Sequence, residues 1–290
     1  MLWNGIWVPT AQEVSSGYTN FTDLLNATGT FTRKDALGRS FSNGQIFDPA
    51  TTRAVTAGQV DPVTGILATA NGYAREPFAN NALPSGRLDP NAIKLLQLYP
   101  AANLSGVQNN YQTTKVNTSG QNTFDVRIDQ HFNDRNQVFG RYSQINNTQH
   151  RIPPFGGVAD GGGYNEGTQT FTVHGVAVSY THVFSPSLIN EVRFGYGQEH
   201  TTRTPTTANT LGIPADFGIG GVPQFKGNGG LPYLGLGKLH NLGGSGWLPG
   251  DRYSDTTQLT ENLTKVYRSH SFKGGVEFQY LYFPWLENIY

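Results

Sequence analysis

The stretch Thr123-Phe124-Asp125-Val126-Arg127-Ile128-Asp129-Gln130-His131-Phe132 decides the fold class. Its even positions are apolar, apart from Gln130, and its odd positions are polar or charged. This is the two-residue period of a β-strand with one apolar and one polar face. From Phe124 to Phe132 such a strand runs about 27 Å at ~3.4 Å per residue. With a tilt of about 40° it spans about 21 Å, close to the ~25 Å apolar band of a transmembrane β-barrel.

Five further segments of the second half of the chain show the same alternation less cleanly. The predicted strands are 137–145, 171–184, 188–197, 259–267 and 271–283. Short and long connections alternate between them: 133–136, 185–187 and 268–270 are tight, whereas 146–167 and 198–255 are long. Transmembrane barrels have short periplasmic turns and longer extracellular loops. The pattern over residues 121–290 therefore predicts barrel strands that are arranged in hairpins.

Residues 1–120 lack this alternation and predict an irregular, loop-rich segment. Turn-forming pairs such as Asp48-Pro49 and Asn109-Asn110 recur along it. One short helix is predicted at about 90–99, with Asp89 as its N-cap, Pro90 in the first helical position and Pro100 after its end. We expect this segment to lie outside the cell if the strands form a membrane barrel.

Composition excludes several classes of protein. Formal net charge is zero, which gives no reason to expect nucleic acid as a partner. Charged residues make up only 14%, against about 25% in soluble domains, and there are no cysteines. No apolar run reaches the ~20 residues of a membrane-spanning helix. The first residues lack the profile of a signal peptide, so we expect the chain to be a piece of a longer protein.

Several motifs resemble, in order, those of Oar-like TonB-dependent outer-membrane receptors. Within the predicted strands they are Asn122–Asp129 with Asn136–Ser143, Tyr180–Glu191 and His270–Phe278. Upstream they are Ile46–Thr52, Arg75–Phe78, Asn80–Pro84 and Arg87–Pro90. The resemblance covers roughly residues 30–285, and it depends on the shared order more than on any one motif.

This resemblance implies a fold and a function. The fold is all-β: a partial transmembrane antiparallel β-barrel, a fragment of a barrel of about 22 strands, with long extracellular loops. The function is ligand uptake across the outer membrane of a Gram-negative bacterium. The implied partners are outer-membrane lipid, the rest of the same barrel and its plug domain, the TonB complex acting through the plug, and an unknown small ligand (siderophore, glycan or peptide). Residues 30–120, 146–167 and 198–255 would be the outer loops, but no ligand-contacting residue can be named.

No catalytic, cofactor or metal site emerges, and we expect no enzyme activity. The seven histidines lack metal-site spacing; they are His131, His150, His174, His182, His200, His240 and His270. Asp125 and Asp129 share a strand face about 13 Å apart, too far for a glycosidase pair, and a polar ladder on the lumen side is the preferred interpretation. The glycine clusters 156–157, 161–163 and 227–230 lack the context of a phosphate loop and are interpreted as flexible loop.

A second interpretation, from a different class of protein, is also compatible with the alternating strands. A soluble, secreted β-sheet adhesin or glycan-binding module has one buried sheet face and alternates in the same way. The discriminating feature is the strip Val192, Phe194, Tyr196, Phe278 and Tyr280. Exposure of this strip as one belt favours lipid, and burial against a second sheet favours the soluble module. An open sheet edge is not tolerated in lipid, so we also expect the isolated chain to aggregate.

Overall fold

A computed structural model describes residues 1–30 and 32–287. The chain divides into two compact units. The barrel unit comprises Met1, residues 115–234 and the chain from residue 241 onward. The N-terminal unit comprises residues 2–114 together with residues 235–240. The sequence predicted a division after residue 120 and did not foresee that a short downstream segment joins the N-terminal unit.

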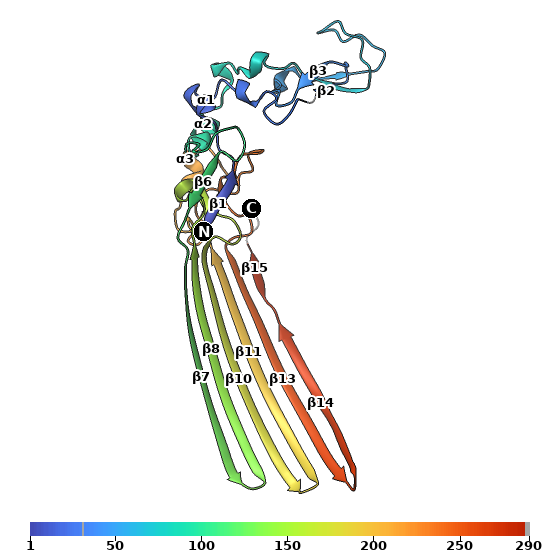
Figure 1. Cartoon of the computed structure of the whole chain (residues 1–290), viewed down its shortest axis with the longest axis vertical. Coiled ribbons are helices and arrows are strands. Elements are labelled where there is room, and N and C mark those ends of the chain that lie inside the picture. The colour runs from blue at the N-terminus through green and yellow to red at the C-terminus, as the bar shows by residue number, and fades with distance from the viewer. Residues whose placement is uncertain (31, 288–290) are drawn as a thin grey trace. The chain divides into compact units, whose positions relative to one another are not determined.

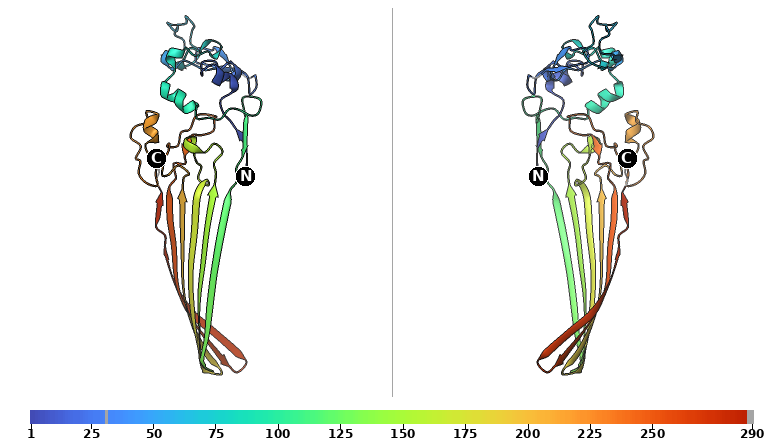
Figure 2. Two further views of the ribbon diagram at one scale, coloured as in Figure 1. Left: turned by 90° about the vertical axis from the view of Figure 1, so that its left-hand side faces the viewer. Right: turned by 90° about the vertical axis from the view of Figure 1, so that its right-hand side faces the viewer.

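The barrel unit is built on one large antiparallel sheet (Figure 1). Its strands pair in chain order, and their bounds are β7 Thr118–Asn133, β8 Asn136–Arg151, β10 Gly167–Ser185, β11 Leu188–Thr204, β13 Gly250–Tyr267 and β14 His270–Tyr282. A seventh strand, β15 (Trp285–Glu287), pairs with the beginning of β13 beyond β14. The sheet is twisted and curved but not closed (Figure 2), and its outermost long strands are β7 and β14. The prediction of an all-β antiparallel fold is confirmed.

All three tight connections lie at one end of this sheet (Figure 1). Between β7 and β8, Asn133 Oδ1 accepts a hydrogen bond from the backbone N–H of Arg135 at 3.0 Å. Between β13 and β14, Arg268 takes a left-handed conformation with φ of 54°. The long connections lie at the opposite end of the sheet, as the alternation of connection lengths predicts.

The strands are longer, and the loops shorter, than the sequence predicts. The predicted loop 146–167 is reduced to 152–166, and the predicted loop 198–255 to 205–249. The added residues form a regular ladder: Thr170, for example, pairs with both Thr148 and Thr202. Both faces of these outer strand ends are polar, so they show no alternation of apolar and polar side chains, although backbone pairing continues through them.

The two long loops of the barrel unit fold against each other. Strands β9 (Asp160–Gly162) and β12 (Gly243–Gly244) pair in parallel, and the short helices η5 (Gly157–Ala159) and α3 (Ile213–Asp216) lie in the same loops. Leu231, Leu242 and Leu248 are buried there. A Cβ at Gly161 would lie 2.7 Å from Thr207 Oγ1, so close packing requires glycine at a position that was interpreted as flexible loop.

The N-terminal unit consists of short elements joined by turns. Its strands form three two-stranded sheets: β1 (Leu2–Ile6) with β6 (Tyr111–Thr114), β2 (Thr32–Lys34) with β3 (Ser40–Ser42), and β4 (Arg53–Val55) with β5 (Gly72–Ala74). Its helices are α1 Ala11–Ser15, η1 Thr22–Leu24, η2 Pro49–Thr51, η3 Ala79–Asn81, η4 Ser85–Arg87 and α2 Pro90–Leu96. The segment is loop-rich, but it contains more regular structure than the single helix that the sequence predicts.

Helix α2 begins as predicted and ends earlier. Asp89 caps it by accepting from the backbone N–H groups of Asn91 and Ala92, and Pro90 takes the first helical position. The helix ends at Leu96 rather than at about residue 99, because the amides of Leu98 and Tyr99 bond three residues back instead of four. None of the described helices is long and apolar enough to cross a membrane.

A small apolar cluster and an ion network stabilise part of the N-terminal unit. Leu37, Val55, Ala68 and Ala74 form the buried cluster. Close in sequence to it, Arg39 bridges Asp35 and Glu76, and Arg53 bridges Asp61 and Glu76, with N–O distances of 2.6 to 2.8 Å. Hydrogen bonds from Arg53 and Thr64 hold the pKa of Asp61 below its ordinary value.

Candidate functional site: two faces of a sheet and a cavity

The large sheet has two chemically different faces, which are fixed by the strand register. Val126 pairs with Tyr142, Tyr142 with Val176, and Val176 with Tyr196. Directly paired residues project from the same face. The apolar residues of this face, here called the apolar band, are Phe124, Val126, Ile128, Val138, Tyr142, Val176, Val178, Tyr180, Val192, Phe194, Tyr196, Leu259, Leu263, Phe272, Val276, Phe278, Tyr280 and Tyr282.

The apolar band is uncovered. Phe278 is 65% exposed, Tyr280 56% and Phe194 41%, and Val192 and Tyr196 are half-buried on the same face. Elsewhere in residues 1–30 and 32–287 the only sheets are two-stranded pairs, and none of the strip is buried against one of them. The discriminating strip thus forms part of one exposed belt, as expected for contact with lipid and not for a soluble two-layer module.

The height of the apolar band matches a membrane, and the strands continue beyond it. On β10, Phe184 continues the same face beyond Tyr180 and His182, and it lies about 27 Å along the strand from Val176, near the ~25 Å of a barrel's apolar zone. From Val176 to Gly167 the strand runs about 30 Å further with polar residues on this face. In this outer part the His200 ring stacks on Tyr253 at 3.9 Å, and His200 Nε2 lies 2.6 Å from Asp251 Oδ1.

The carboxylate of Glu261 breaks the pattern of the apolar band. Glu261 pairs with Val192 and Val276 and therefore lies on the apolar face. The side-chain amide of Asn190 donates a hydrogen bond to Glu261 Oε1 at 2.9 Å. Nothing further in the structure explains this position.

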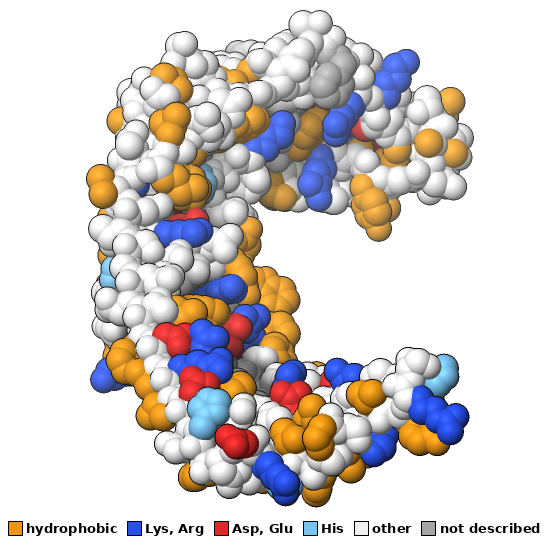
Figure 3. All heavy atoms as spheres, turned by 60° about the horizontal axis from the view of Figure 1, so that its bottom comes forward, with side chains coloured by type: hydrophobic (Ala, Val, Ile, Leu, Met, Phe, Trp, Pro, Cys, Tyr) orange, Lys and Arg blue, Asp and Glu red, His pale blue; other side chains and the backbone are white. Residues whose placement is uncertain are grey.

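The opposite face, here called the polar wall, carries ion pairs. Asp125 accepts from Arg141 at 2.5 Å, Asp129 from Arg127 at 2.7 Å, and Glu191 from Arg193 at 2.8 Å. In Figure 3, acidic and basic side chains gather over the strands on the inner side of the curved sheet. Such exposed pairs are screened by solvent and contribute little to stability. Their effect is to make this face wettable, as a water-filled or plugged lumen requires.

The residues considered as catalytic or metal candidates do not assemble into a site. Asp125 and Asp129 are each engaged by a different arginine, an arrangement that fits a polar ladder. Among the described residues there is no group of three or more side chains suited to hold a metal ion. On the strands, His174 bonds Tyr142, His182 bonds Asn136, and His150 bonds Thr168. His131 and His270 are exposed near the tight turns, and His240 lies in the N-terminal unit.

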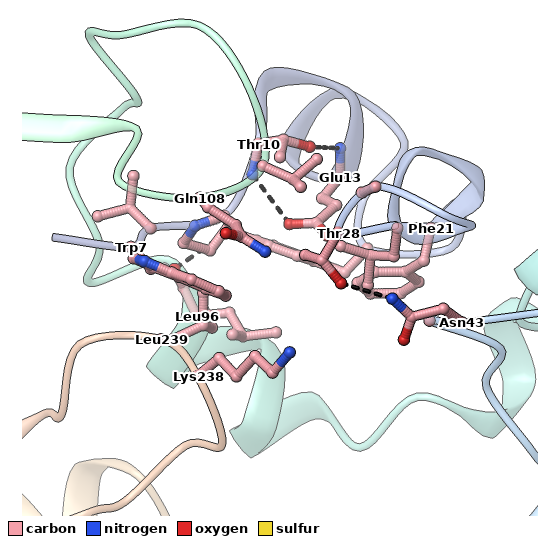
Figure 4. A pocket seen from close by; sticks show the side chains of 17 residues that line it. Trp7, Thr10, Glu13, Phe21, Thr28, Asn43, Leu96, Gln108, Lys238 and Leu239 are labelled. Atoms are coloured by element: carbon pink, nitrogen blue, oxygen red, sulfur yellow. Dashed lines mark hydrogen bonds between the residues drawn. The ribbon is translucent and has the colours of Figure 1, made fainter. Parts of the chain in front are cut away.

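The N-terminal unit contains a cavity of about 340 Å³ that the sequence analysis did not anticipate (Figure 4). Its walls come from five parts of the chain: residues 7–13, 18–28, 43–44, 96–108 and 238–239. Most of the walls are apolar, with Trp7, Phe21 and Leu96 among them. Glu13 and Lys238 bring an acidic and a basic group to the cavity. A volume of this size is at the lower end of the range for small-molecule sites, about 300–1,000 Å³.

Glu13 is held at the cavity by the start of helix α1. Thr10 is the N-cap: its hydroxyl accepts from the Glu13 backbone N–H, and Glu13 Oε2 accepts from the Thr10 backbone N–H at 2.9 Å. This reciprocal capping box has the sequence form Thr-x-x-Glu, a signal that was present at residues 10–13. Burial, together with the nearby charge of Asp23, raises the pKa of Glu13 to about 7.

This pKa predicts that rising pH destabilises the α1 region. Glu13 holds its proton in the folded state up to about pH 7, whereas the unfolded chain releases it near pH 4.5. The folded state thus binds more protons between these values, and its stability falls as pH rises through that window. After discounting for partial solvent access, we expect a loss on the order of 1–2 kcal/mol between pH 5 and pH 8.

The substitution Glu13→Gln keeps the acceptor for the Thr10 amide but cannot ionise. Native-state hydrogen exchange of the Ser16 and Tyr18 amides, which bond to Gln12 and Glu13 carbonyls, measures local opening of this region. The unsubstituted protein should lose protection with pH after correction for intrinsic exchange, and E13Q should not. If protection against exchange depends on pH equally in the two proteins, the raised pKa of Glu13 is not the cause of the destabilisation.

Comparison with known proteins agrees with the geometry of the sheet. A family model described as an outer membrane beta barrel domain matches residues 5–288, almost the whole chain. No curated protein and no solved structure matches. Membership of this family implies a location in the outer membrane of Gram-negative bacteria, with the apolar band facing lipid. The chain therefore belongs to the family of outer membrane beta barrel domains.

Proposed function

We propose that the chain is part of a TonB-dependent uptake receptor of the Oar-like type. The observation that carries the proposal is the ordered set of receptor-like motifs on strands that have an apolar band on one face and a polar wall on the other. The motif Asn122–Asp129 lies in β7, and the motif Tyr180–Glu191 spans the tight turn from β10 to β11. These motifs thus fall on the strands and turns of the large sheet, whereas the upstream motifs, between residues 46 and 90, lie in the N-terminal unit.

The open edges of the sheet support a larger barrel. Within residues 1–30 and 32–287, β7 and β14 are each paired on one side only, and an unpaired backbone group in lipid costs several kcal/mol. Neighbouring strands of the same barrel would satisfy both edges, and a plug domain inside the lumen would contact the polar wall. In this proposal the TonB complex acts on that plug, and the ligand enters from the side of the long loops.

The direct test uses the full-length protein and two measurements. Cell fractionation should recover it in the outer membrane, and immobilised periplasmic domain of TonB should retain it from detergent extracts. A cytosolic location would reject the membrane assignment. Recovery in the outer membrane without any retention by TonB would reject the receptor proposal alone, leaving an outer-membrane barrel of another kind.

A further inference from the structure

The cavity of the N-terminal unit has an acidic end that lacks a basic partner. The Thr10 hydroxyl donates to Asp23 Oδ2 at 2.5 Å, so Thr10 links the Asp23 and Glu13 carboxyl groups. The other oxygen of Asp23, Oδ1, is buried without a hydrogen-bond partner in the part of the chain that the structure describes. Within the same described residues, no lysine or arginine forms a salt bridge with either carboxyl group. A cationic group in the cavity would meet the Glu13 carboxyl group, which lines it, while Asp23 lies behind Thr10 and is not part of the lining.

The opposite side of the cavity carries a cation that lacks an acidic partner. Lys238 projects toward the cavity from below in Figure 4, across from Glu13. Its ammonium lies 5.6 Å from the centre of the Trp7 ring, and among the described residues it forms no salt bridge. An anionic group placed beside Lys238 would therefore meet a positive charge that is held in place by an aromatic ring.

The wall between these two ends is apolar and partly aromatic. Trp7, Phe21 and Leu96 contribute to it, with Tyr18 beside the acidic end. A phosphate or other dianion would be repelled by Glu13 and Asp23, and a sugar would leave the apolar wall and both charges unmatched. The matching molecule has an apolar body with a cationic group at one end and an anionic group at the other.

We propose that this cavity binds a small zwitterion with an apolar body and its two charges at opposite ends, of the class of apolar dipeptides. The ammonium of the ligand lies at Glu13, its carboxylate lies at Lys238, and its side chains pack on Trp7 and Phe21. Binding itself does not depend on the proposed uptake function. That the bound molecule is also the imported one rests on that function.

The test is calorimetric titration of the full-length protein in detergent with a dipeptide of phenylalanine and leucine. We expect binding, and affinity at least about tenfold weaker for the N-acetylated and for the C-terminally amidated dipeptide, since each loses one ion pair. No heat of binding at about 1 mM dipeptide, or equal affinity for the capped forms, would overturn the proposal.

Two variants assign the ends of the ligand. Lys238→Met should abolish the preference for the free carboxylate over the amide, and Glu13→Gln should reduce the preference for the free ammonium over the acetyl group. Lys34→Met, at an exposed lysine of the same unit outside the cavity, is the matched control and should keep both preferences. Loss of both preferences in this control would assign the effect to net charge and refute the site.

The dipeptide titration and the TonB retention experiment fail independently. Dipeptide binding without TonB retention would support the cavity proposal and reject the uptake proposal. TonB retention without dipeptide binding would support the uptake proposal and reject the cavity proposal.

Discussion

Replacing Asn81 by alanine is expected to unfold much of the N-terminal unit. The Asn81 side chain is fully buried, and its amide donates to the backbone carbonyls of Phe21 and Gly44. Its Oδ1 accepts from the backbone N–H of Ile46 and from the side chain of Gln45. Three chain segments that are distant in sequence therefore meet at one side chain.

The expected cost follows from the groups left without partners. Asn81→Ala removes the side-chain partner of the Gly44 carbonyl and of the Ile46 backbone N–H, two partly buried groups that each cost about 1–3 kcal/mol when left unsatisfied. The Phe21 carbonyl also loses a hydrogen bond but still accepts from the Leu24 amide. It also places alanine at a φ of 52°, which asparagine tolerates better. Partial entry of water lowers the sum, so we expect a destabilisation of about 3–5 kcal/mol, at the extreme of single substitutions.

Asn80→Ala is a close control for this experiment. Asn80 has the same φ of 52°, but its side chain is exposed. It should cost about 1 kcal/mol, from backbone conformation alone. Guanidinium denaturation, followed by the fluorescence of Trp3 and Trp7, measures both variants. Similar midpoints for N80A and N81A would show that the buried amide contributes little beyond its backbone conformation.

The apolar parts of the strands could be predicted from sequence because lipid contact imposes a two-residue pattern. Val126 and Ile128 on β7, and Val192 and Phe194 on β11, alternate with charged side chains of the polar wall. The outer ends of the same strands could not be predicted, since Thr170 and Thr202 pair where both faces meet water and no pattern is selected. Strand pairing there depends on the continued ladder and not on side-chain chemistry.

The structure of the N-terminal unit was largely hidden from sequence analysis. Asn109-Asn110 was interpreted as a turn former, yet the Asn110 amide is buried and bonds both the N–H and the carbonyl of Val8. The two residues are 102 positions apart, and no local pattern reports such a contact. The cavity is hidden for the same reason, because its walls come from segments spread between residues 7 and 239. Of the cavity, only the capping box at Thr10 and Glu13 was open to local analysis, and elsewhere in the unit local sequence predicted the start of helix α2 at Asp89 and Pro90.

An arginine in the middle of the apolar band is expected to impair folding of the barrel in the membrane. Val178 lies on β10 between Val176 and Tyr180, and its paired neighbours are Gly140 and Phe194. Val178→Arg places a guanidinium against hydrocarbon, which costs about 2–4 kcal/mol near the midplane of a bilayer. Neither paired neighbour offers a carboxylate to offset this cost.

The matched control places the same residue at the same level on the other face. Gln258 adjoins Leu259, which pairs with Phe194, but it projects from the polar wall between Gly195 and Gln279. Gln258→Arg therefore adds its charge to a wettable surface and should cost less than about 1 kcal/mol. The measurement is guanidinium denaturation of the full-length protein in lipid vesicles, together with its folded yield in outer membranes. If the two arginines cost the same, the apolar band does not face lipid, and the polar wall cannot be assigned to the lumen.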